Sequence, residues 1–219
     1  MDNKSNLHIL DIKPKNQTRA IVIWLHGLGA NANDFEPVLP ILNEIAPGIR
    51  YIFPNAPLMS VSVNGGMTMP AWYDIIHPDL SVEQDLAGIE ASCLKLETLI
   101  NQVQSETDQQ VPVFLAGFSQ GGVIALTTAL TRSVNIKGVI ALSTYLPNIN
   151  LDKSDKKSLS ILMMHGLNDP IVPIKYARKS FDAISQTVND AQWHEYPMEH
   201  SLSYEEIQEM GNWLNKFIN

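Results

Sequence analysis

The stretch that decides the fold is Val111-Pro112-Val113-Phe114-Leu115-Ala116-Gly117-Phe118-Ser119-Gln120-Gly121-Gly122. Its first half, Val111–Ala116, is an apolar run that predicts a buried strand, and the residues from Gln120 to Thr131 predict a helix. Between them lies a G-x-S-x-G pentapeptide centred on Ser119. A serine at such a strand-to-helix turn is held in a strained backbone, and its hydroxyl stands at the carboxyl edge of the sheet. The flanks therefore predict that Ser119 is a nucleophile rather than an incidental serine in a glycine-rich turn.

Outward from this stretch, short apolar runs alternate with helical patterns. Several of the runs are apolar on successive residues, which is typical of strands buried on both faces of a parallel sheet. The other predicted strands are Ala20–Leu25, Ile49–Phe53, Lys137–Leu142, Leu159–Met164 and Gln192–Tyr196. This alternation predicts an α/β protein with a mostly parallel central sheet and helices on both faces. We expect residues 1–219 to form a single α/β-hydrolase domain, with residues 1–19 as an N-terminal extension or edge strands.

Two helix starts carry capping-box patterns. Ser81 with Gln84 predicts that a helix begins at Ser81, and Ser203 with Glu206 predicts the start of the last helix. The first helix carries an apolar stripe from Val82 to Val103. A further helix is predicted over Ile174–Thr187.

A serine nucleophile needs a base, and the base needs a carboxylate that orients it. In an α/β-hydrolase these residues follow the serine in the order acid, then histidine. Asp169 comes just after the predicted strand Leu159–Met164, and His200 follows the strand that ends at Tyr196. Both positions lie at the same sheet edge as Ser119. His165 and His194 are expected to be structural, and Glu199 is the alternative acid.

An oxyanion hole needs two backbone N–H donors. One is expected from Gln120, the residue after the nucleophile, and the other from the loop His26-Gly27-Leu28-Gly29-Ala30, at Leu28. The segment from Gly27 to Ala32 also fits the G-x-G-x-x-A fingerprint of dinucleotide sites. That fingerprint needs an acid after the next strand, and Pro54-Asn55 stands there instead. The nucleotide interpretation is therefore disfavoured.

Composition narrows the function classes. The formal net charge is −8 over 219 residues and there is no run of Lys or Arg, so nucleic-acid binding is not expected. The single cysteine, Cys93, permits no disulfide within the chain and no cysteine metal site, and it is expected to be a small core residue. The first ten residues lack the apolar stretch of a signal peptide, so a cytoplasmic location is predicted. We expect neither a metal nor a cofactor.

With these residues in place, the chain resembles the acyl-protein thioesterase and small carboxylesterase family, also called the phospholipase/carboxylesterase group, from about Ala20 to the C-terminus. The motifs that carry the resemblance are Leu25-His26-Gly27-Leu28-Gly29, Pro54-Asn55-Ala56-Pro57, Ala71-Trp72-Tyr73-Asp74-Ile75, Gly117-Phe118-Ser119-Gln120-Gly121-Gly122, Ala141-Leu142-Ser143, His165-Gly166 with Asp169, and Tyr196 with His200. The resemblance implies a Ser119–Asp169–His200 triad and oxyanion amides at Leu28 and Gln120. It also implies that an acyl channel runs past Leu28, the loop from Pro57 to Trp72, and Tyr145. Within that channel, Leu58, Met67, Met69, Trp72 and Tyr145 are the predicted substrate-binding residues. Asp74 is expected to be structural. A homodimer would suit the family.

The predicted function is hydrolysis of short-to-medium acyl esters or thioesters through an acyl-enzyme on Ser119. The alternatives are a protein-depalmitoylating thioesterase, a lysophospholipase, an acyl transferase, or a non-catalytic binding module on the same fold. The expected partner is an acyl ester or thioester, as a small molecule, a lipid or an acylated protein. The loop 58–69 contains three methionines, two valines and a leucine. This composition predicts one of two structures. The loop is either a short hairpin, or a lid that is hinged at Gly65-Gly66 and makes transient contact with a membrane.

Overall fold

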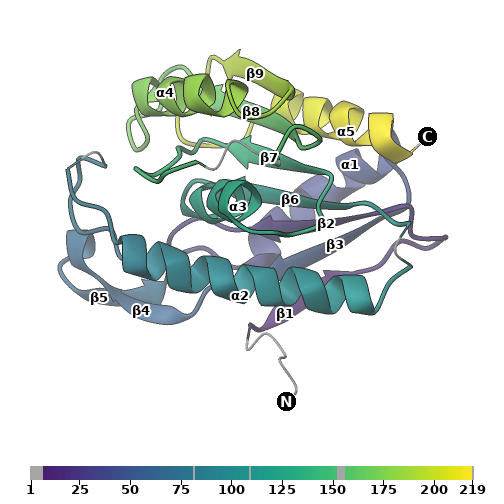
Figure 1. The fold of residues 1–219 in the computed structure, drawn as a ribbon, viewed down its shortest axis with the longest axis horizontal. Helices are drawn as coiled ribbons and strands as arrows, with labels where there is room; N and C mark the ends of the chain where they lie inside the picture. Colours follow the sequence, from purple (N-terminus) through teal and green to yellow (C-terminus); the bar gives the residue numbers. More distant parts are fainter. Residues whose placement is uncertain (1–6, 81, 109, 152–155, 219) are drawn as a thin grey trace.

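The fold is built on a sheet of seven strands, seen in a computed structural model that describes residues 7–80, 82–108, 110–151 and 156–218. The strand order is β1-β3-β2-β6-β7-β8-β9, and every pairing is parallel except that of β1 with β3 (Figure 1). These strands are β1 (Ile9–Ile12), β2 (Ala20–Leu25), β3 (Ile49–Pro54), β6 (Val113–Phe118), β7 (Gly138–Leu142), β8 (Ser160–Gly166) and β9 (Asp190–Tyr196). The predicted mostly parallel sheet is confirmed, and within residues 1–19 β1 is an edge strand.

Side chains alternate between the two faces of this sheet. In β2, Ile21, Ile23 and Leu25 enter one apolar cluster, while Val22 and Trp24 enter the other. Because successive residues of a strand point to opposite faces, a sheet covered on both sides needs an apolar residue at every position. This explains why the inner strands β2, β6 and β7 carry continuous apolar runs.

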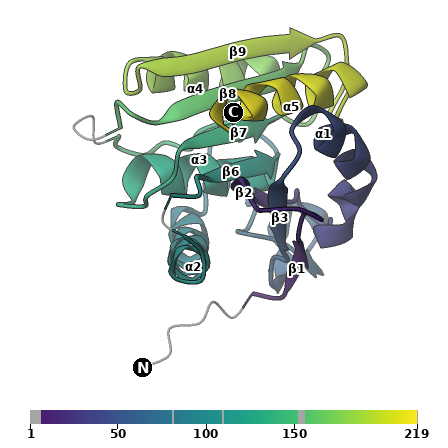
Figure 2. The same ribbon diagram turned by 90° about the vertical axis from the view of Figure 1, so that its right-hand side faces the viewer.

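Helices cover both faces (Figure 2). One cluster takes residues from α2 (Leu86–Ser105), α3 (Gln120–Thr131) and α4 (Ile174–Ser185). The other takes residues from the 3₁₀ helix η1 (Ala32–Val38), from α1 (Leu39–Ile45) and from α5 (Tyr204–Ile218). Among the described residues, no helix has both the length and the apolar character needed to cross a bilayer.

The start of α2 differs from the prediction. Ser81 lies outside the described residues, and the helix begins at Leu86 with Asp85 as its N-cap. The Asp85 carboxylate accepts a hydrogen bond of 2.8 Å from the Gly88 N–H. Val82 is 64% exposed, so the apolar stripe does not extend back to it. A carboxylate that accepts from a first-turn amide stabilises a helix start, and here it lies four residues past Ser81.

The start of α5 shows half of the predicted capping box. The Ser203 hydroxyl accepts a hydrogen bond of 3.1 Å from the Glu206 N–H. The Glu206 side chain is fully buried, and neither carboxylate oxygen has a hydrogen-bond partner of normal geometry in the described part of the chain. Burial raises the pKa of Glu206 to about 8, although the backbone N–H of Ser203 at the cap acts in the opposite direction.

Residues 58–70 form a separate antiparallel hairpin. It consists of β4 (Leu58–Val61), the short 3₁₀ turn η2 (Ser62–Asn64) and β5 (Met67–Pro70). Gly65 and Gly66 have φ of 65° and 80°, which glycine adopts without steric cost, so the pair forms the turn. The Asp74 carboxylate holds the hairpin by accepting hydrogen bonds of 2.7 and 2.5 Å from the Ser62 N–H and hydroxyl.

Candidate active site

Ser119 lies at the junction of β6 and α3 in a conformation that few non-glycine residues adopt. Its φ is 53° and its ψ is −119°. The Ser119 N–H donates to the Leu142 carbonyl over 2.9 Å, and the Thr144 hydroxyl donates to the Ser119 carbonyl over 2.7 Å. A Cβ at Gly117 would collide with the backbone of Gly121. The tight turn therefore requires glycine, and the neighbouring strand holds the strained serine in place.

Asp169 and His200 meet at the carboxyl ends of β8 and β9. His200 Nδ1 lies 2.7 Å from Asp169 Oδ2. The other carboxylate oxygen accepts hydrogen bonds from the N–H groups of Ile171 and Val172 over 2.9 and 2.8 Å. Burial of the Asp169 carboxyl would raise its pKa, but the hydrogen bonds from His200 and from the two backbone amides outweigh it, so the pKa of Asp169 is lowered. The ionised carboxylate accepts from His200, which places a proton on Nδ1 and leaves Nε2 as the basic nitrogen.

Ser119 and His200 line the same cavity, and the ring of Phe118 packs against the His200 imidazole at 4.8 Å between centroids. Within the described residues, the Ser119 hydroxyl has no hydrogen-bond partner. The hydrogen bond between a catalytic serine and its histidine is often long in an unliganded enzyme and shortens when substrate binds. Ser119, Asp169 and His200 lie far apart in the sequence, and the structure thus brings these three predicted residues together.

The cavity beside Ser119 has a volume of about 370 Å³. The residues that line it are mainly apolar, and Asp34 is the one lining residue that carries a carboxylate. The apolar side chains are those of Leu28, Phe35, Ile75, Phe118, Ile171 and Leu202. A small, mostly apolar cavity next to a nucleophile is what an acyl group needs.

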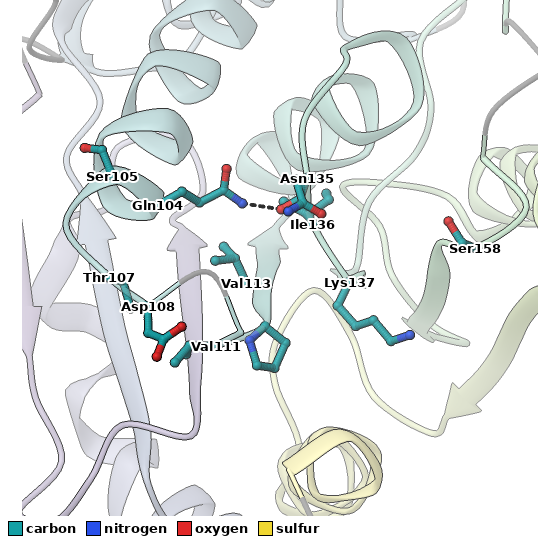
Figure 3. Close-up of a pocket in the computed structure, with 11 residues that line it drawn as sticks. Gln104, Ser105, Thr107, Asp108, Val111, Val113, Asn135, Ile136, Lys137 and Ser158 are labelled. Atoms are coloured by element: carbon teal, nitrogen blue, oxygen red, sulfur yellow. Dashed lines mark hydrogen bonds between the residues drawn. The ribbon is translucent and has the colours of Figure 1, made fainter.

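A larger cavity, of about 580 Å³, lies at the other end of the sheet (Figure 3). It is lined by residues at the amino ends of the strands, such as Val113 and Lys137, together with Gln104 and Asn135. The catalytic candidates all follow carboxyl ends of strands, which is where active sites form in open α/β sheets. Cavity size alone therefore does not locate the site.

The loop after β2 lies against the nucleophile. A Cβ placed on Gly27 would be 3.5 Å from the Ser119 Cβ. The Ala30 N–H donates to the Gly27 carbonyl over 3.3 Å, and the Gly29 N–H donates to the Pro70 carbonyl over 2.8 Å. Among the residues described, the Leu28 N–H has no hydrogen-bond partner. The Gln120 N–H is the first of α3 and has no carbonyl of its own helix to bind. As far as the structure describes the chain, two unpaired amides therefore lie beside Ser119.

The five predicted substrate-binding residues lie elsewhere than the cavity wall. Leu58 and Met67 are exposed on the hairpin, and the Met69 sulfur would be 3.7 Å from a Cβ on Gly29. Trp72 and Tyr145 are buried. Their roles in substrate binding stay predictions.

Trp72 and Tyr145 take part in hydrogen bonds beneath the site. The Trp72 indole N–H donates to the His26 carbonyl over 2.9 Å, and its backbone N–H donates to the Gln120 side chain over 2.8 Å. That same Gln120 side chain donates to the Tyr73 carbonyl over 2.7 Å. The Tyr145 hydroxyl lies 3.3 Å from that of Tyr73.

Sequence reasoning missed most of the cavity wall. Phe35, Ile75, Phe118, Ile171 and Leu202 were not identified, although Ile171 and Leu202 each lie two residues after a triad candidate. Proximity in sequence to Asp169 and His200 was the signal that could have found these two. His165, predicted to be structural, is buried; its Nε2 lies 2.8 Å from the Val172 carbonyl, beside Asp169.

Comparisons with known proteins identify the family of the chain. The sequence model of the phospholipase/carboxylesterase family matches residues 8–218. Acyl-protein thioesterase 1 of Cryptococcus neoformans is 32% identical over an alignment of 231 positions that covers 96% of this chain and 97% of the relative. Acyl-protein thioesterase 1 of Mycosarcoma maydis is 34% identical over an alignment of 236 positions that covers 98% of each chain.

Among solved structures, Zea mays acyl-protein thioesterase 2 superposes with a TM-score of 0.84 at 25% identity, covering 97% of this chain and 99% of that one. A carboxylesterase of Bacillus cereus has the same fold, with a TM-score of 0.81 at 17% identity over 99% of this chain and 100% of that one. The chain therefore belongs to the phospholipase/carboxylesterase family of α/β-hydrolases.

Proposed function

We propose that this protein hydrolyses acyl esters and thioesters through an acyl-enzyme on Ser119. The observation that carries the proposal is the cavity that Ser119 shares with His200, whose imidazole is bound to the buried Asp169 carboxylate over 2.7 Å. Membership of the phospholipase/carboxylesterase family supports the same reaction class. The names of the relatives, acyl-protein thioesterase 1 and 2, support a thioester substrate in particular.

In the proposed mechanism, Ser119 Oγ attacks the acyl carbon while His200 Nε2 takes the hydroxyl proton. The negative charge that develops on the carbonyl oxygen is held by the N–H groups of Leu28 and Gln120. Asp169 stabilises the imidazolium of His200, which then protonates the departing alcohol or thiolate. Water attacks the acyl-enzyme with His200 again as base, and the carboxylic acid leaves. The scheme uses no metal and no cofactor.

The apolar cavity of about 370 Å³ is the proposed acyl site. Asp34 in its wall favours an acyl-protein or neutral ester over a lysophospholipid with an anionic head group, because the carboxylate would repel that head group. Replacement of Asp34 by Asn should therefore raise kcat/KM for an anionic lysophospholipid more than for a neutral thioester. Equal effects on both substrates would remove Asp34 as the reason for discrimination.

The central experiment is labelling with a fluorophosphonate probe, followed by turnover of esters, thioesters and lysolipids of several chain lengths. Wild type and Ser201→Ala should react with the probe and hydrolyse the substrates, whereas Ser119→Ala should not react with the probe and should lose on the order of 10⁴-fold or more in kcat. EDTA should leave turnover unchanged. A wild-type protein that neither labels nor hydrolyses any ester would instead be a binding module on this fold.

The proposal extends to a lipid surface. Leu58 is 71% exposed and Met67 is 64% exposed on the hairpin of residues 58–70. Because the net charge is −8, overall electrostatic attraction to anionic lipid is disfavoured, so apolar insertion would carry the contact and resist added salt. Leu58→Ser with Met67→Ser should lower vesicle co-sedimentation at low and at high salt. Val82→Ser is the matched control, since Val82 is 64% exposed outside the hairpin.

Three finer parts of the proposal need their own measurements. Hinged motion of the hairpin at Gly65-Gly66 would appear as faster amide hydrogen exchange there than in the central sheet. A homodimer would appear in light scattering after gel filtration. Cell fractionation tests the cytoplasmic location.

A further inference from the structure

The backbone turn at Gly27–Ala30 determines the direction of the Leu28 N–H. Gly29 has a φ of 74°, and the Ala30 N–H donates to the Gly27 carbonyl, so these four residues form a type II turn. The Gly27 carbonyl and the Leu28 N–H belong to the same trans peptide unit, in which they point in opposite directions. Whatever holds the Gly27 carbonyl therefore also aims the Leu28 N–H.

The imidazole of His26 holds that carbonyl. His26 Nδ1 lies 2.7 Å from the Gly27 carbonyl oxygen, and the Ala56 N–H donates to His26 Nε2 over 3.0 Å. Because Nε2 accepts from a backbone N–H, the ring proton of a neutral imidazole must be on Nδ1, which donates to Gly27. The contact with Ala56 therefore selects the tautomer that the Gly27 peptide needs.

The surroundings of the His26 imidazole favour its neutral form. His26 is fully buried, and burial lowers its pKa, although the contact with Gly27 and the charge of Asp34 act in the opposite direction. A protonated imidazole would place an N–H at Nε2 against the N–H of Ala56, so the neutral form fits this site.

We propose that His26 is a positioning residue for the oxyanion hole: its Nδ1–H holds the Gly27 carbonyl and thereby directs the Leu28 N–H toward the oxygen of the reacting acyl group. Ala56 fixes the tautomer, and Pro70 engages the Gly29 amide, so that the Leu28 amide alone is left for the substrate within residues 28–30. The inference rests on the proposed function, and it explains how the Leu28 N–H of the oxyanion hole is oriented.

Two substitutions separate the two contacts of His26. Asn has its amide nitrogen near the place of Nδ1 and can still donate to Gly27, but it cannot reach Ala56. Gln reaches the place of Nε2 and can still accept from Ala56, but it lacks the donor to Gly27. We expect His26→Asn to keep kcat within about threefold of wild type and His26→Gln to lower it by about tenfold or more, less than loss of a whole oxyanion donor. KM should change little in either variant.

A trifluoromethyl ketone, which forms a tetrahedral oxyanion on the serine, gives a second readout. Its inhibition constant should rise by the same factor by which kcat falls, since both depend on the oxyanion. Ser92→Ala is the control: it removes a buried hydrogen bond, from the Ser92 hydroxyl to the Trp72 carbonyl, without touching the Gly27 peptide. It should lower the melting temperature but leave the inhibition constant unchanged.

Equal losses in the two His26 variants, or a larger loss in His26→Asn, would overturn the inference. If neither variant folds, the imidazole ¹⁵N shifts of the wild-type protein still decide the matter, because a proton on Nε2 at neutral pH would also overturn it. Failure of the proposed function itself would look different: the wild type would not label with fluorophosphonate.

Discussion

His200 and Asp169 are 31 positions apart in the chain, yet His200 Nδ1 lies 2.7 Å from Asp169 Oδ2. The contact exists because β8 and β9 are adjacent parallel strands whose carboxyl ends open at the same edge of the sheet. Two further hydrogen bonds, from Ile171 and Val172, hold the other oxygen of the carboxylate, so its orientation does not depend on His200 alone.

Replacement of Asp169 by Asn should lower kcat by on the order of 10³- to 10⁴-fold. The amide N–H can donate a hydrogen bond to an unprotonated His200 Nδ1, which favours the wrong tautomer, and the neutral amide lacks the charge that stabilises the imidazolium. Turnover of a p-nitrophenyl ester measures the effect, and Glu199→Gln is the control that should stay near wild type. Near-normal turnover of Asp169→Asn together with a large loss in Glu199→Gln would transfer the role of the acid to Glu199.

Replacement of Glu206 by Gln should stabilise the protein in a pH-dependent way. The folded-state pKa of about 8 lies above the ordinary value of 4.5, so the folded protein keeps a proton that the unfolded chain releases. The stability that depends on this proton is complete below about pH 4.5 and is lost as the pH rises toward 8. Gln does not titrate, so its advantage should grow by up to about 1.4 kcal/mol per pH unit across that range.

Urea unfolding of wild type and Glu206→Gln at pH 5, 6.5 and 8 checks this. Glu205→Gln, at an exposed position on the same turn, should show no such trend. A constant difference between Glu206→Gln and wild type at all three pH values would show that Glu206 does not titrate abnormally.

Replacement of Ile75 by Trp should shift the preferred acyl chain toward shorter esters, because Ile75 lines the cavity beside Ser119. A bulkier side chain occupies volume that the distal methylenes of a long chain would fill. The ratio of kcat/KM for octanoyl and acetyl p-nitrophenyl esters measures the shift. The neighbouring Ile76 is 36% exposed and is not part of the cavity wall, so Ile76→Trp should leave the ratio unchanged. Equal shifts in both variants would place the acyl site elsewhere.

Replacement of Gln120 by Leu should destabilise the protein more than it impairs the chemistry. The Gln120 side chain pairs with the Trp72 N–H and the Tyr73 carbonyl, and its loss leaves two buried backbone groups unsatisfied. The cost should be about 2 kcal/mol or more, equivalent to roughly 5 °C in melting temperature. The backbone N–H of residue 120 survives the substitution, so kcat should fall less than tenfold. A loss comparable to that of Ser119→Ala would mean that the side chain acts in catalysis.

Much of the fold could be predicted because its signals are local. The inner strands β2, β6 and β7 are continuous apolar runs, and the Ser119 turn is identified by its own pentapeptide and flanks. The helices of residues 32–45 were not predicted, because Pro37 and Pro40 interrupt the helical pattern. For α2, the capping pattern at Ser81 competed with the Asp85 carboxylate, and a single sequence does not show which cap forms.

The sequence by itself determined the inner strands of the sheet and the elbow at Ser119, and it predicted the roles of Asp169 and His200, since each follows from residue types next to one another or from the order of the strands. Only the tertiary structure decided how Asp169 is held, which side chains line the cavity and where the Glu206 carboxylate lies. The same is true of the contact between His26 and Gly27, which depends on Ala56 from another part of the chain. These properties depend on distances between segments that pack together, and neither periodicity nor motif spacing contains those distances.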